Sequence, residues 1–451
     1  MIILHYFLGF PPYRSGGLTK YVMDLMETQV EDGNRVLALW PGKMKFFSSK
    51  VSIKKRKLIG NIESYEIINP LPVPLDEGIK EIDEFIKPCD MKVYMNFVMN
   101  NKPDVVHIHT LMGIHKEFIE VLNHLGIRCV YTSHDYFGIC PKVNLYCEGK
   151  PCENNNDYNK CVKCNKNALS INKIRVMQSP IYRRVKESKL IKAIRKKHRN
   201  TFFEENESEI CDKGEDIEKE GVDKYKKLRQ YYVNMYEMID CIHYNSMTAK
   251  QIFGRYVNEK DSRVITITHK GIKDNRECIK YCPEEGKIRL TMLAPARPYK
   301  GYYVLKKALD ELWEEGSKKF VLNIFGKIEK PSPYMNIVEN GFTHEQFEEI
   351  FDKTDVVIAP SIWYETFGFT VLEALSYGIP VIISENVGAK DIAGNGGISV
   401  VAGDVNDLKE KISKLTKSKL IKMHNEILKT KIKLWEEFVG ENYELYRQER
   451  S

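Results

Sequence analysis

The chain has 451 residues and a net charge of +7, with 69 Lys and Arg against 62 Asp and Glu. A chain of this length is too long for one ordinary hydrophobic core, so we predict two domains. The sequence contains no run of about 18 apolar residues, so no transmembrane helix is expected. Residues 1–7 lack the basic region and cleavage site of a signal peptide and predict a first strand. We therefore expect a cytoplasmic protein whose 11 cysteines are thiols or metal ligands rather than disulfides.

The N-terminal half alternates strand and helix patterns. The first strand leads into a loop with Gly16 and Gly17, which comes just before a helix. The further elements predicted in this half are a helix at 18–32, a strand at 36–40, a strand at 104–109, a helix at 115–125, and strands at 128–133, 240–246 and 263–269.

A polar stretch at 274–286 predicts the domain boundary, which we place after residue 280. The second domain is predicted to cover 281–425. Its predicted elements are strands at 287–293, 320–325, 355–360 and from 381, and helices at 304–315 and from 369. The fold class is therefore α/β, with two Rossmann-like βαβ domains that face a central crevice. Ligands of such sheets bind beyond the carboxyl ends of the strands.

One segment of the second domain suggests the ligand. Glu365 and Glu373 stand on either side of the start of the helix from Phe369, and Gly368 lets the backbone come close to a bound group. A helix N-terminus favours a phosphate, and a carboxylate accepts hydrogen bonds from sugar hydroxyls. The segment therefore predicts a site for a nucleoside diphosphate sugar. The competing interpretation is a solvent-facing Glu pair on an ordinary helix.

The Glu-x7-Glu segment, with Phe-Gly between the acids and Gly-x-Pro-Val after them, resembles the signature of retaining, GT-B-fold glycosyltransferases of family 4. The resemblance implies that Glu365 contacts the donor sugar and Glu373 the ribose of a UDP- or GDP-linked donor. The backbone at Phe367, Gly368 and Phe369 would then meet the diphosphate. It also implies that the last segment, 426–451, is a helix that packs back toward the N-terminal domain; packing on the second domain is the alternative.

Further residues match the same resemblance. Arg297 and Lys300, after the first strand of the second domain, resemble the family's cations for the diphosphate, although the spacing between them is shorter than usual. His109 ends a strand and resembles a family residue close to the donor sugar, whereas His107 is expected in the core. The Gly16–Gly17 loop faces the diphosphate or the acceptor. His134 and Asp135 are candidates for acceptor binding or proton removal.

Two mechanisms are open from the residues: a protein nucleophile, or a same-face transfer in which the leaving phosphate helps to deprotonate the acceptor. The resemblance favours the second. Catalysis then rests on positioning and on stabilising the departing diphosphate. We expect no catalytic metal, because Arg297, Lys300 and the helix dipole supply positive charge and the sequence has no Asp-x-Asp motif at the predicted site.

A cluster of cysteines, with five inside 25 residues, predicts a structural metal site. The preferred ligands are four thiolates, and Cys140 is the substitute. Zinc, an iron–sulfur cluster and unligated thiols are the three interpretations, and the preferred set is Cys147, Cys152, Cys161 and Cys164.

A charged insertion at about 170–230 begins with a basic block that carries interleaved apolar residues. The basic block has two interpretations: it docks onto an anionic membrane surface, or it is a solvated helical face. No nucleic-acid motif accompanies it, and we expect no nucleic acid. The sequence as a whole predicts a glycosyltransferase for a glycan or lipid-linked acceptor, in surface polysaccharide or glycoconjugate synthesis. A non-catalytic GT-B subunit that binds a protein or glycan is the rival.

Overall fold

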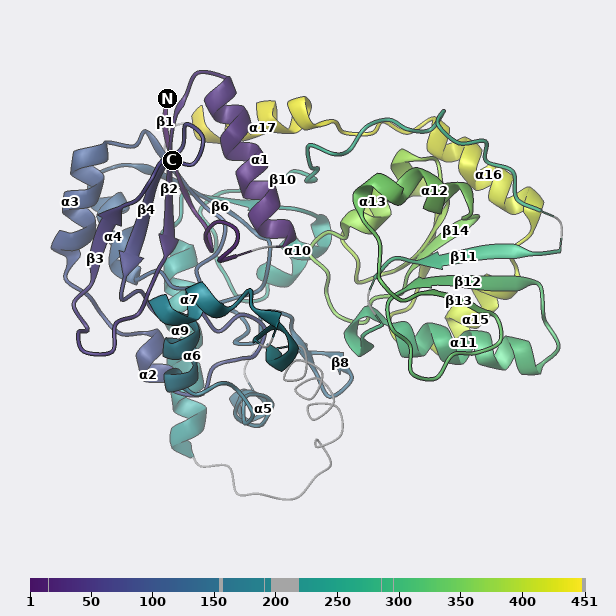
Figure 1. Ribbon diagram of the computed structural model, residues 1–451, viewed down its shortest axis with the longest axis horizontal. Helices are drawn as coiled ribbons and strands as arrows, with labels where there is room; N and C mark the ends of the chain where they lie inside the picture. The colour runs from purple at the N-terminus through teal and green to yellow at the C-terminus, as the bar shows by residue number, and fades with distance from the viewer. Residues whose placement is uncertain are drawn as a thin grey trace.

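A computed structural model describes residues 1–14, 16–153, 157–189, 191–195, 219–284, 286–294 and 296–447. The chain forms two α/β domains that lie side by side (Figure 1). Part of the charged insertion predicted from the sequence, including residues 196–218, lies outside the described residues. None of the described helices is long and apolar enough to span a membrane.

The N-terminal domain is built on an eight-stranded sheet that is parallel except for its edge strand β3, which runs antiparallel to β4. In spatial order the strands are β10 (Ser262–Val264), β9 (Cys241–Tyr244), β6 (Arg128–Thr132), β5 (Val105–Ile108), β1 (Ile2–Tyr6), β2 (Arg35–Pro41), β4 (Glu63–Ile68) and β3 (Ser52–Lys55). The described helices of this domain are α1 (Gly17–Glu31), α2 (Ile82–Phe85), α3 (Met91–Asn101), α4 (Lys116–His124), α5 (Tyr158–Cys164), α6 (Ile171–Met177), α7 (Pro180–Val185), α9 (Lys219–Met238) and α10 (Met247–Phe253).

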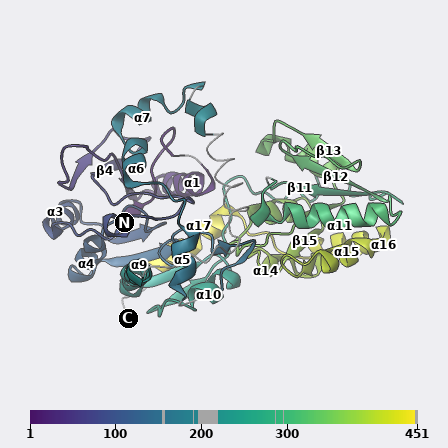
Figure 2. The same cartoon turned by 90° about the horizontal axis from the view of Figure 1, so that it is seen from below.

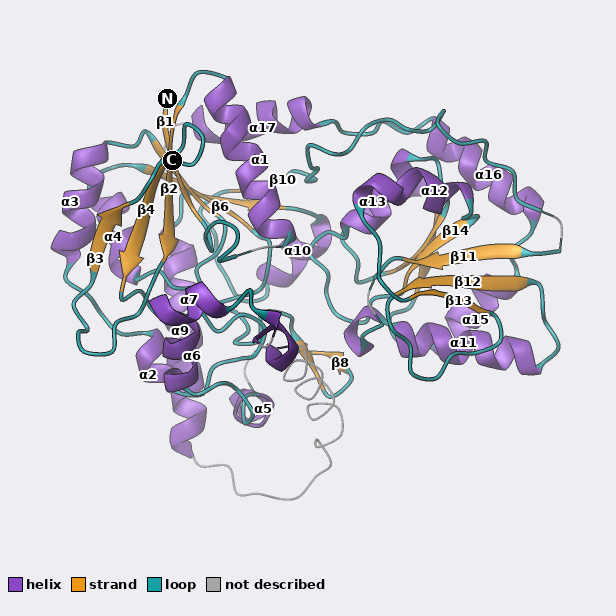
Figure 3. Cartoon of the chain, viewed as in Figure 1, coloured by secondary structure: helices purple, strands orange, loops and turns teal. Residues whose placement is uncertain are grey.

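The C-terminal domain has a six-stranded, wholly parallel sheet between helices (Figure 3). Two neighbouring strands, Val356–Ala359 and Val381–Ser384, are fully buried and almost continuously apolar, as expected where both faces of a parallel sheet are covered. In spatial order the strands of the sheet are β13 (Met335–Val338), β12 (Phe320–Phe325), β11 (Ile288–Met292), β14 (Val356–Ala359), β15 (Val381–Ser384) and β16 (Gly397–Val400). The helices are α11 (Tyr302–Glu314), α12 (Phe347–Asp352), α13 (Phe369–Ser376), α14 (Lys390–Ala393), α15 (Val405–Ser413) and α16 (Lys417–Leu428), with single 3₁₀ turns at η1 (Pro298–Lys300), η2 (His344–Gln346) and η3 (Gly394–Gly396).

The last helix, α17 (Trp435–Arg447), lies against the N-terminal domain in both views (Figures 1 and 2). The Tyr446 hydroxyl is 2.7 Å from His107 Nδ1, and Trp435 Nε1 donates to Thr28 Oγ1 at 2.9 Å. The helix predicted at 426–451 begins later than expected, at Trp435, because α16 ends at Leu428 and α17 is a separate helix. Arg276 Nη1 donates to the carbonyl oxygens of Ile427, Leu428 and Thr430, which satisfies the end of α16 outside the helix.

The strand expected at 263–269 is shorter than predicted, because β10 ends at Val264. Ile265 N still donates to the Tyr244 carbonyl, but the Ile265 carbonyl accepts from the ring of His243. Beyond this point Ile267 enters an apolar cluster that also contains Phe367 and Val387 of the second domain. The chain therefore leaves the first sheet to join the domains.

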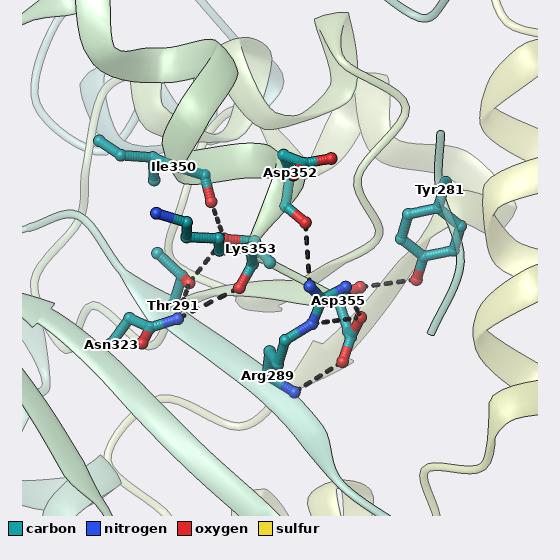
Figure 4. Close-up of polar contacts among 9 residues, drawn as sticks. Tyr281, Arg289, Thr291, Asn323, Ile350, Asp352, Lys353 and Asp355 are labelled. Carbon is teal, nitrogen blue, oxygen red and sulfur yellow. Dashed lines mark hydrogen bonds and ion pairs between the residues drawn. The ribbon is translucent and has the colours of Figure 1, made fainter. Parts of the chain in front are cut away.

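The strands β11 and β14 are fastened at their amino ends, away from the ligand edge (Figure 4). Asp355 is fully buried and its carboxylate accepts from the backbone N–H of Arg289 at 2.7 Å and from its guanidinium at 2.6 Å. The Tyr281 hydroxyl donates to the Asp355 carbonyl at 2.7 Å. This network fixes the two strands whose other ends carry the candidate site.

We expect Asp355→Ala to lower the free energy of unfolding by about 3 kcal/mol or more, because it leaves the partly buried Arg289 guanidinium without its carboxylate. Urea unfolding measures the change. The matched control is Glu349→Ala, whose ion pair with Lys353 is 70% and 65% exposed and contributes about 0.5 kcal/mol or less. Equal effects of the two variants would contradict the role assigned to Asp355.

Candidate functional site

The loops after β11 and β14 bring a cation and a carboxylate together at the carboxyl edge of the second sheet. Lys300 Nζ lies 2.7 Å from Glu365 Oε1, and the Ser361 hydroxyl donates to Glu365 Oε2 at 2.8 Å. The Lys300 side chain is 17% exposed and the Glu365 side chain is 18% exposed. Two residues picked from separate sequence segments are therefore direct partners. A half-buried pair of this kind can exchange its internal contact for a charged ligand.

The Lys300 side chain lies on an aromatic platform. Its ammonium is 5.0 Å from the centre of the Trp363 ring, and Trp363 packs edge-on against Tyr299 at 5.3 Å. Ile362 N donates to the Tyr299 carbonyl at 2.9 Å, which ties the two loops together. Arg297 Nη1 donates to the Tyr299 hydroxyl at 2.6 Å. Arg297 is therefore held by Tyr299, and Lys300 lies over Trp363, the other ring of the same platform.

Helix α13 begins where the sequence predicted. Its N-cap, Gly368, has a φ of 105°, and a Cβ there would approach Val387 Cγ1 to 2.9 Å, so glycine is required. Phe367 is buried and Phe369 opens the helix, with ring centres 5.5 Å apart. No side chain caps this end. The Val371 N–H bonds to the Gly368 carbonyl, which leaves the N–H groups of Phe369 and Thr370 for an anion. Glu365 is close by, since a Cβ on Gly368 would lie 3.7 Å from its Cδ.

Glu373 does not contact this pair but faces two histidines. Its side chain is 5% exposed, and its Oε1 is 3.4 Å from His269 Nε2 and 3.4 Å from His344 Nδ1. His269 comes from the segment that joins the domains and packs edge-on against Phe369 at 5.3 Å. No motif or spacing in the sequence marks either histidine, because His269 lies 104 residues and His344 29 residues before Glu373 and the three meet only in the folded chain.

Five further histidines, of which only His134 is partly exposed, form a hydrogen-bonded chain in the N-terminal domain. His109 Nε2 is 3.0 Å from His5 Nδ1, and its Nδ1 is 3.4 Å from His134 Nε2. The chain continues to α17, since His5 Nε2 is 2.6 Å from Gln29 Oε1, and Gln29 Nε2 donates to Tyr446. It then continues from Tyr446 to His107 Nδ1, from His107 Nε2 to Thr132, from Thr132 to His243 Nδ1, and from His243 Nε2 to the Ile265 carbonyl.

The tautomers of this chain follow from its fixed end. The Ile265 carbonyl only accepts, so His243 carries its proton on Nε2 and its Nδ1 accepts from the Thr132 hydroxyl. Thr132 must then accept from His107 Nε2–H, and Tyr446 must donate to His107 Nδ1. The same argument puts the proton on Nε2 of His5, His109 and His134. With all five rings neutral, every hydrogen bond of the chain has one donor and one acceptor. One ring nitrogen from each of His5, His107 and His109 lies within 4.8 Å of the other two, and hydrogen bonding within the chain accounts for this closeness.

These contacts change the position expected for His109. It is fully buried, and both ring nitrogens face other histidines rather than the crevice. His107 is likewise in the core, as expected. His134 and Asp135 are partly exposed at the end of β6, and the His134 carbonyl accepts from the Thr366 hydroxyl at 3.1 Å. The residue after Glu365 thus touches the strand end that carries the candidate acceptor residues.

The glycine loop and the cysteines complete the predicted set. Gly16 has a φ of 120° and precedes Gly17, the first residue of α1; both are exposed. Neither meets the Lys300–Glu365 pair through any contact found among the described residues. Of the five clustered cysteines, Cys147 lies on β7 (Tyr146–Cys147), Cys161 and Cys164 lie on α5, and Cys140 and Cys152 lie in the adjoining loops.

Comparisons with known proteins agree with this architecture. Residues 279–433 match the model of the family described as glycosyl transferases group 1. The chain is similar to the solved structures of sucrose-phosphate synthase from Thermosynechococcus elongatus (13% identity, TM-score 0.55, 99% of this chain and 98% of that one) and of a glycosyltransferase from Rickettsia africae (13%, 0.54, 99% and 97%). It also resembles an α,α-trehalose-phosphate synthase from Burkholderia xenovorans (9%, 0.55, 99% and 100%). No curated protein sequence matches. The likenesses confirm the GT-B fold expected from the sequence.

We expect the folded state to lose stability as the pH falls below about 6.5. Burial lowers the pKa of His5 to about 4, of His134 to about 3 and of His243 to about 4. Between these values and 6.5 the unfolded chain binds protons that the folded chain does not, so stability is full above pH 6.5 and decreases on acidification. Each histidine that stays neutral contributes about 1.4 kcal/mol per pH unit.

Urea unfolding at pH 7.5 and 5.5 measures this decrease. Asp135 opposes part of it below pH 6, because burial raises its pKa to about 6 and the folded state then takes up its proton first. Replacing the exposed His124 by Gln is the control and should leave the decrease unchanged. Equal stability at the two pH values would contradict a neutral histidine chain.

Proposed function

We propose that this protein is a retaining glycosyltransferase that moves a sugar from a UDP- or GDP-linked donor to a glycan or lipid-linked acceptor. The observation that carries the proposal is the Lys300–Glu365 pair beside the N-terminus of α13, at the carboxyl edge of the second sheet. It lies within the segment that matches the family model. Cation, carboxylate and helix N-terminus are the three groups that a sugar diphosphate requires.

In this proposal the donor diphosphate displaces Glu365 from Lys300. Lys300 and Arg297 then hold the phosphates with the first N–H groups of α13, while Glu365 accepts hydrogen bonds from the donor sugar. Glu373 accepts from the ribose hydroxyls, and His269 and His344 position its carboxylate, since both rings lie 3.4 Å from it. Glu373 is a poor candidate for a solvent-facing residue, because its side chain is almost fully buried.

The bond between the anomeric carbon and the diphosphate breaks as charge builds on the leaving phosphate. Lys300, Arg297 and the helix dipole stabilise this charge, which is the largest contribution expected at such a site. The acceptor hydroxyl attacks from the face that the phosphate leaves, and the phosphate oxygen takes the proton. Neither a covalent enzyme intermediate nor a divalent metal is part of this route.

The N-terminal domain would supply the acceptor side. His134 and Asp135 lie at the end of β6, and the His134 carbonyl accepts from Thr366 of the Glu365 loop, which supports a role for this strand end in acceptor binding. His109 is better described as a positioning residue, because its two nitrogens fix the ring of His134 and that of His5. The rival, a non-catalytic subunit, would not need the Lys300–Glu365 pair.

We also propose a peripheral site at the inner face of a membrane, in the synthesis of a surface polysaccharide or glycoconjugate. The support is the exposed face of α7, where Ile181 is 72% exposed beside Arg184 and Val185. Arg183, on the same helix, is not part of this face. It pairs with the buried Glu66 at 2.7 Å and lies over the Tyr13 ring at 3.9 Å.

Screening nucleotide sugars tests the main proposal. One UDP- or GDP-linked sugar should raise the melting temperature, and its slow hydrolysis or transfer should release the nucleoside diphosphate. Both should persist in EDTA during a brief assay. Release that stops in EDTA and returns with magnesium or manganese would disprove the metal-free route. No binding or turnover with any nucleotide sugar would favour the non-catalytic rival.

Glu373→Ala should weaken binding of the nucleoside diphosphate by about 10- to 150-fold, because a hydrogen bond to a charged group contributes roughly 1.5–3 kcal/mol. Glu365→Ala should chiefly lower turnover or change the preferred sugar. Calorimetry and steady-state kinetics separate the two effects. Glu339→Ala, an exposed carboxylate of the same domain, is the control. Unchanged nucleotide affinity in Glu373→Ala would remove the ribose assignment.

Arg184→Glu with Lys189→Glu should abolish binding to anionic liposomes, since both cations are exposed on and after α7. Binding by the unmodified protein should fall with salt as the Debye length shortens from about 8 Å at 0.15 M to about 3 Å at 1 M. The control is Lys307→Glu with Lys319→Glu, which makes the same charge change on the exposed surface of the other domain and should leave liposome binding intact. Cosedimentation that is equal for the two pairs of variants would contradict docking through α7.

A further inference from the structure

The loop between β2 and β3 presents two adjacent phenylalanines to solvent. Phe46 is 56% exposed and Phe47 is fully exposed. Neither ring belongs to any of the apolar clusters formed by the described residues. Single exposed apolar side chains are common on protein surfaces, but two large rings in succession on one loop mark a surface that another apolar phase covers.

Both ends of this loop, residues 45–50, are fastened to one buried side chain. Asn69 follows β4 and is 7% exposed. Its Oδ1 accepts from the Lys45 N–H at 2.7 Å, and its Nδ2 donates to the Lys50 carbonyl at 2.8 Å. We call residues 45–50 the phenylalanine loop. Its two rings are displayed between anchored points, so a partner that covers them need not first order a loose chain.

Exposed lysines surround the two rings. Those on the loop and on or just after β3 are Lys45, Lys50, Lys54 and Lys57. In the described part of the chain none of these four ammonium groups forms an ion pair with a carboxylate, whereas Lys55 lies 2.7 Å from Glu63. Apolar rings among unpaired ammonium groups match an anionic bilayer, in which the rings enter the acyl boundary and the lysines meet lipid phosphates.

A buried carboxylate joins the phenylalanine loop to α7. Glu66 of β4 is 2% exposed, accepts from the Lys43 N–H at 2.8 Å and pairs with Arg183 of α7 at 2.7 Å. In addition, the Met44 N–H donates to the carbonyl of Gln178, which comes directly before the N-cap of α7. The loop and the exposed face of α7 therefore share one base.

The position of the loop in the sheet relates it to the acceptor side. Strand β2 runs parallel to β1, β1 to β5, and β5 to β6. The chain that follows β2 therefore leaves the sheet at the same edge as His134, which follows β6. This is the edge at which parallel sheets bind their ligands. A membrane that covers the loop would thus lie at the acceptor edge of the N-terminal domain.

We propose that the phenylalanine loop inserts Phe46 and Phe47 into the interface of an anionic membrane, while the surrounding lysines bind the lipid phosphates. The inference rests on the proposed membrane location and adds an apolar anchor to the contact made by α7. Two anchors on one base fix the orientation of the domain, which a single short helix does not. A second copy of this chain is a poorer occupant, because the unpaired lysines of two such loops would face each other.

Cosedimentation with vesicles of phosphatidylglycerol and phosphatidylcholine tests the insertion. Phe46→Ser with Phe47→Ser should weaken binding by about tenfold or more, because both rings lose their burial in the lipid. Vesicles of phosphatidylcholine alone should bind the unmodified protein about tenfold less, since they offer the lysines no negative surface. Val401→Ser with Leu428→Ser, which changes two exposed apolar residues of the second domain, is the control and should bind normally.

A tryptophan at the tip of the loop reports its depth. The emission of Phe47→Trp, taken as the difference from the unmodified protein, should shift to shorter wavelength with anionic vesicles. Lipids brominated in their acyl chains should quench it. Val401→Trp should show neither effect, because this half-exposed position belongs to the other domain.

Unchanged binding by the serine pair of the loop, or no quenching of Phe47→Trp by brominated lipids, would overturn the insertion and leave docking through α7 intact. A lipid-free dimer that the same serine pair dissociates, seen by sedimentation equilibrium, would assign the loop to a second copy and also overturn it. No vesicle binding by the unmodified protein would overturn the insertion and the membrane location together. None of these readouts depends on glycosyl transfer, which the nucleotide-sugar screen decides separately.

Discussion

The ion pair between Lys300 and Glu365 connects the loops that follow two neighbouring strands of the second sheet. It exists because parallel strands end at one edge, and because glycine allows the close approach there: a Cβ on Gly301 would lie 1.9 Å from the Pro360 carbonyl oxygen. The pair keeps both charges satisfied in a half-buried setting. Any ligand that needs this cation must bring its own negative charge, and we propose a diphosphate.

The two domains also contact each other at the loop that carries Glu365. Thr366 donates to the His134 carbonyl, and Ser246 donates to the Thr366 carbonyl at 2.8 Å, so the residue after Glu365 is held from the N-terminal side. Behind His134 the histidine chain runs to Tyr446 of α17, a helix that has itself crossed from the second domain. The end of β6, the Glu365 loop and the returning helix α17 are thereby linked by hydrogen bonds, although they come from different segments of the chain.

The sequence predicted the features that depend on residues close together in the chain. The helix at Phe369, Gly368 as its N-cap, the strands around it and the GT-B fold could all be inferred from residues close in the chain. It did not reveal His269 and His344 beside Glu373, nor the burial of His109, because these depend on contacts between residues 25 to 104 positions apart in the chain. The break between α16 and α17 was missed because Arg276, which satisfies the end of α16, lies about 150 residues earlier.

The central claim is that Lys300 receives the donor diphosphate. Calorimetry with a nucleoside diphosphate and the matching monophosphate tests it directly. The unmodified protein should bind the diphosphate at least about tenfold more tightly, and Lys300→Ala should remove most of this preference while Lys307→Ala keeps it, because a charge-assisted hydrogen bond contributes roughly 1.5–3 kcal/mol. An undiminished preference for the diphosphate in Lys300→Ala would contradict the account.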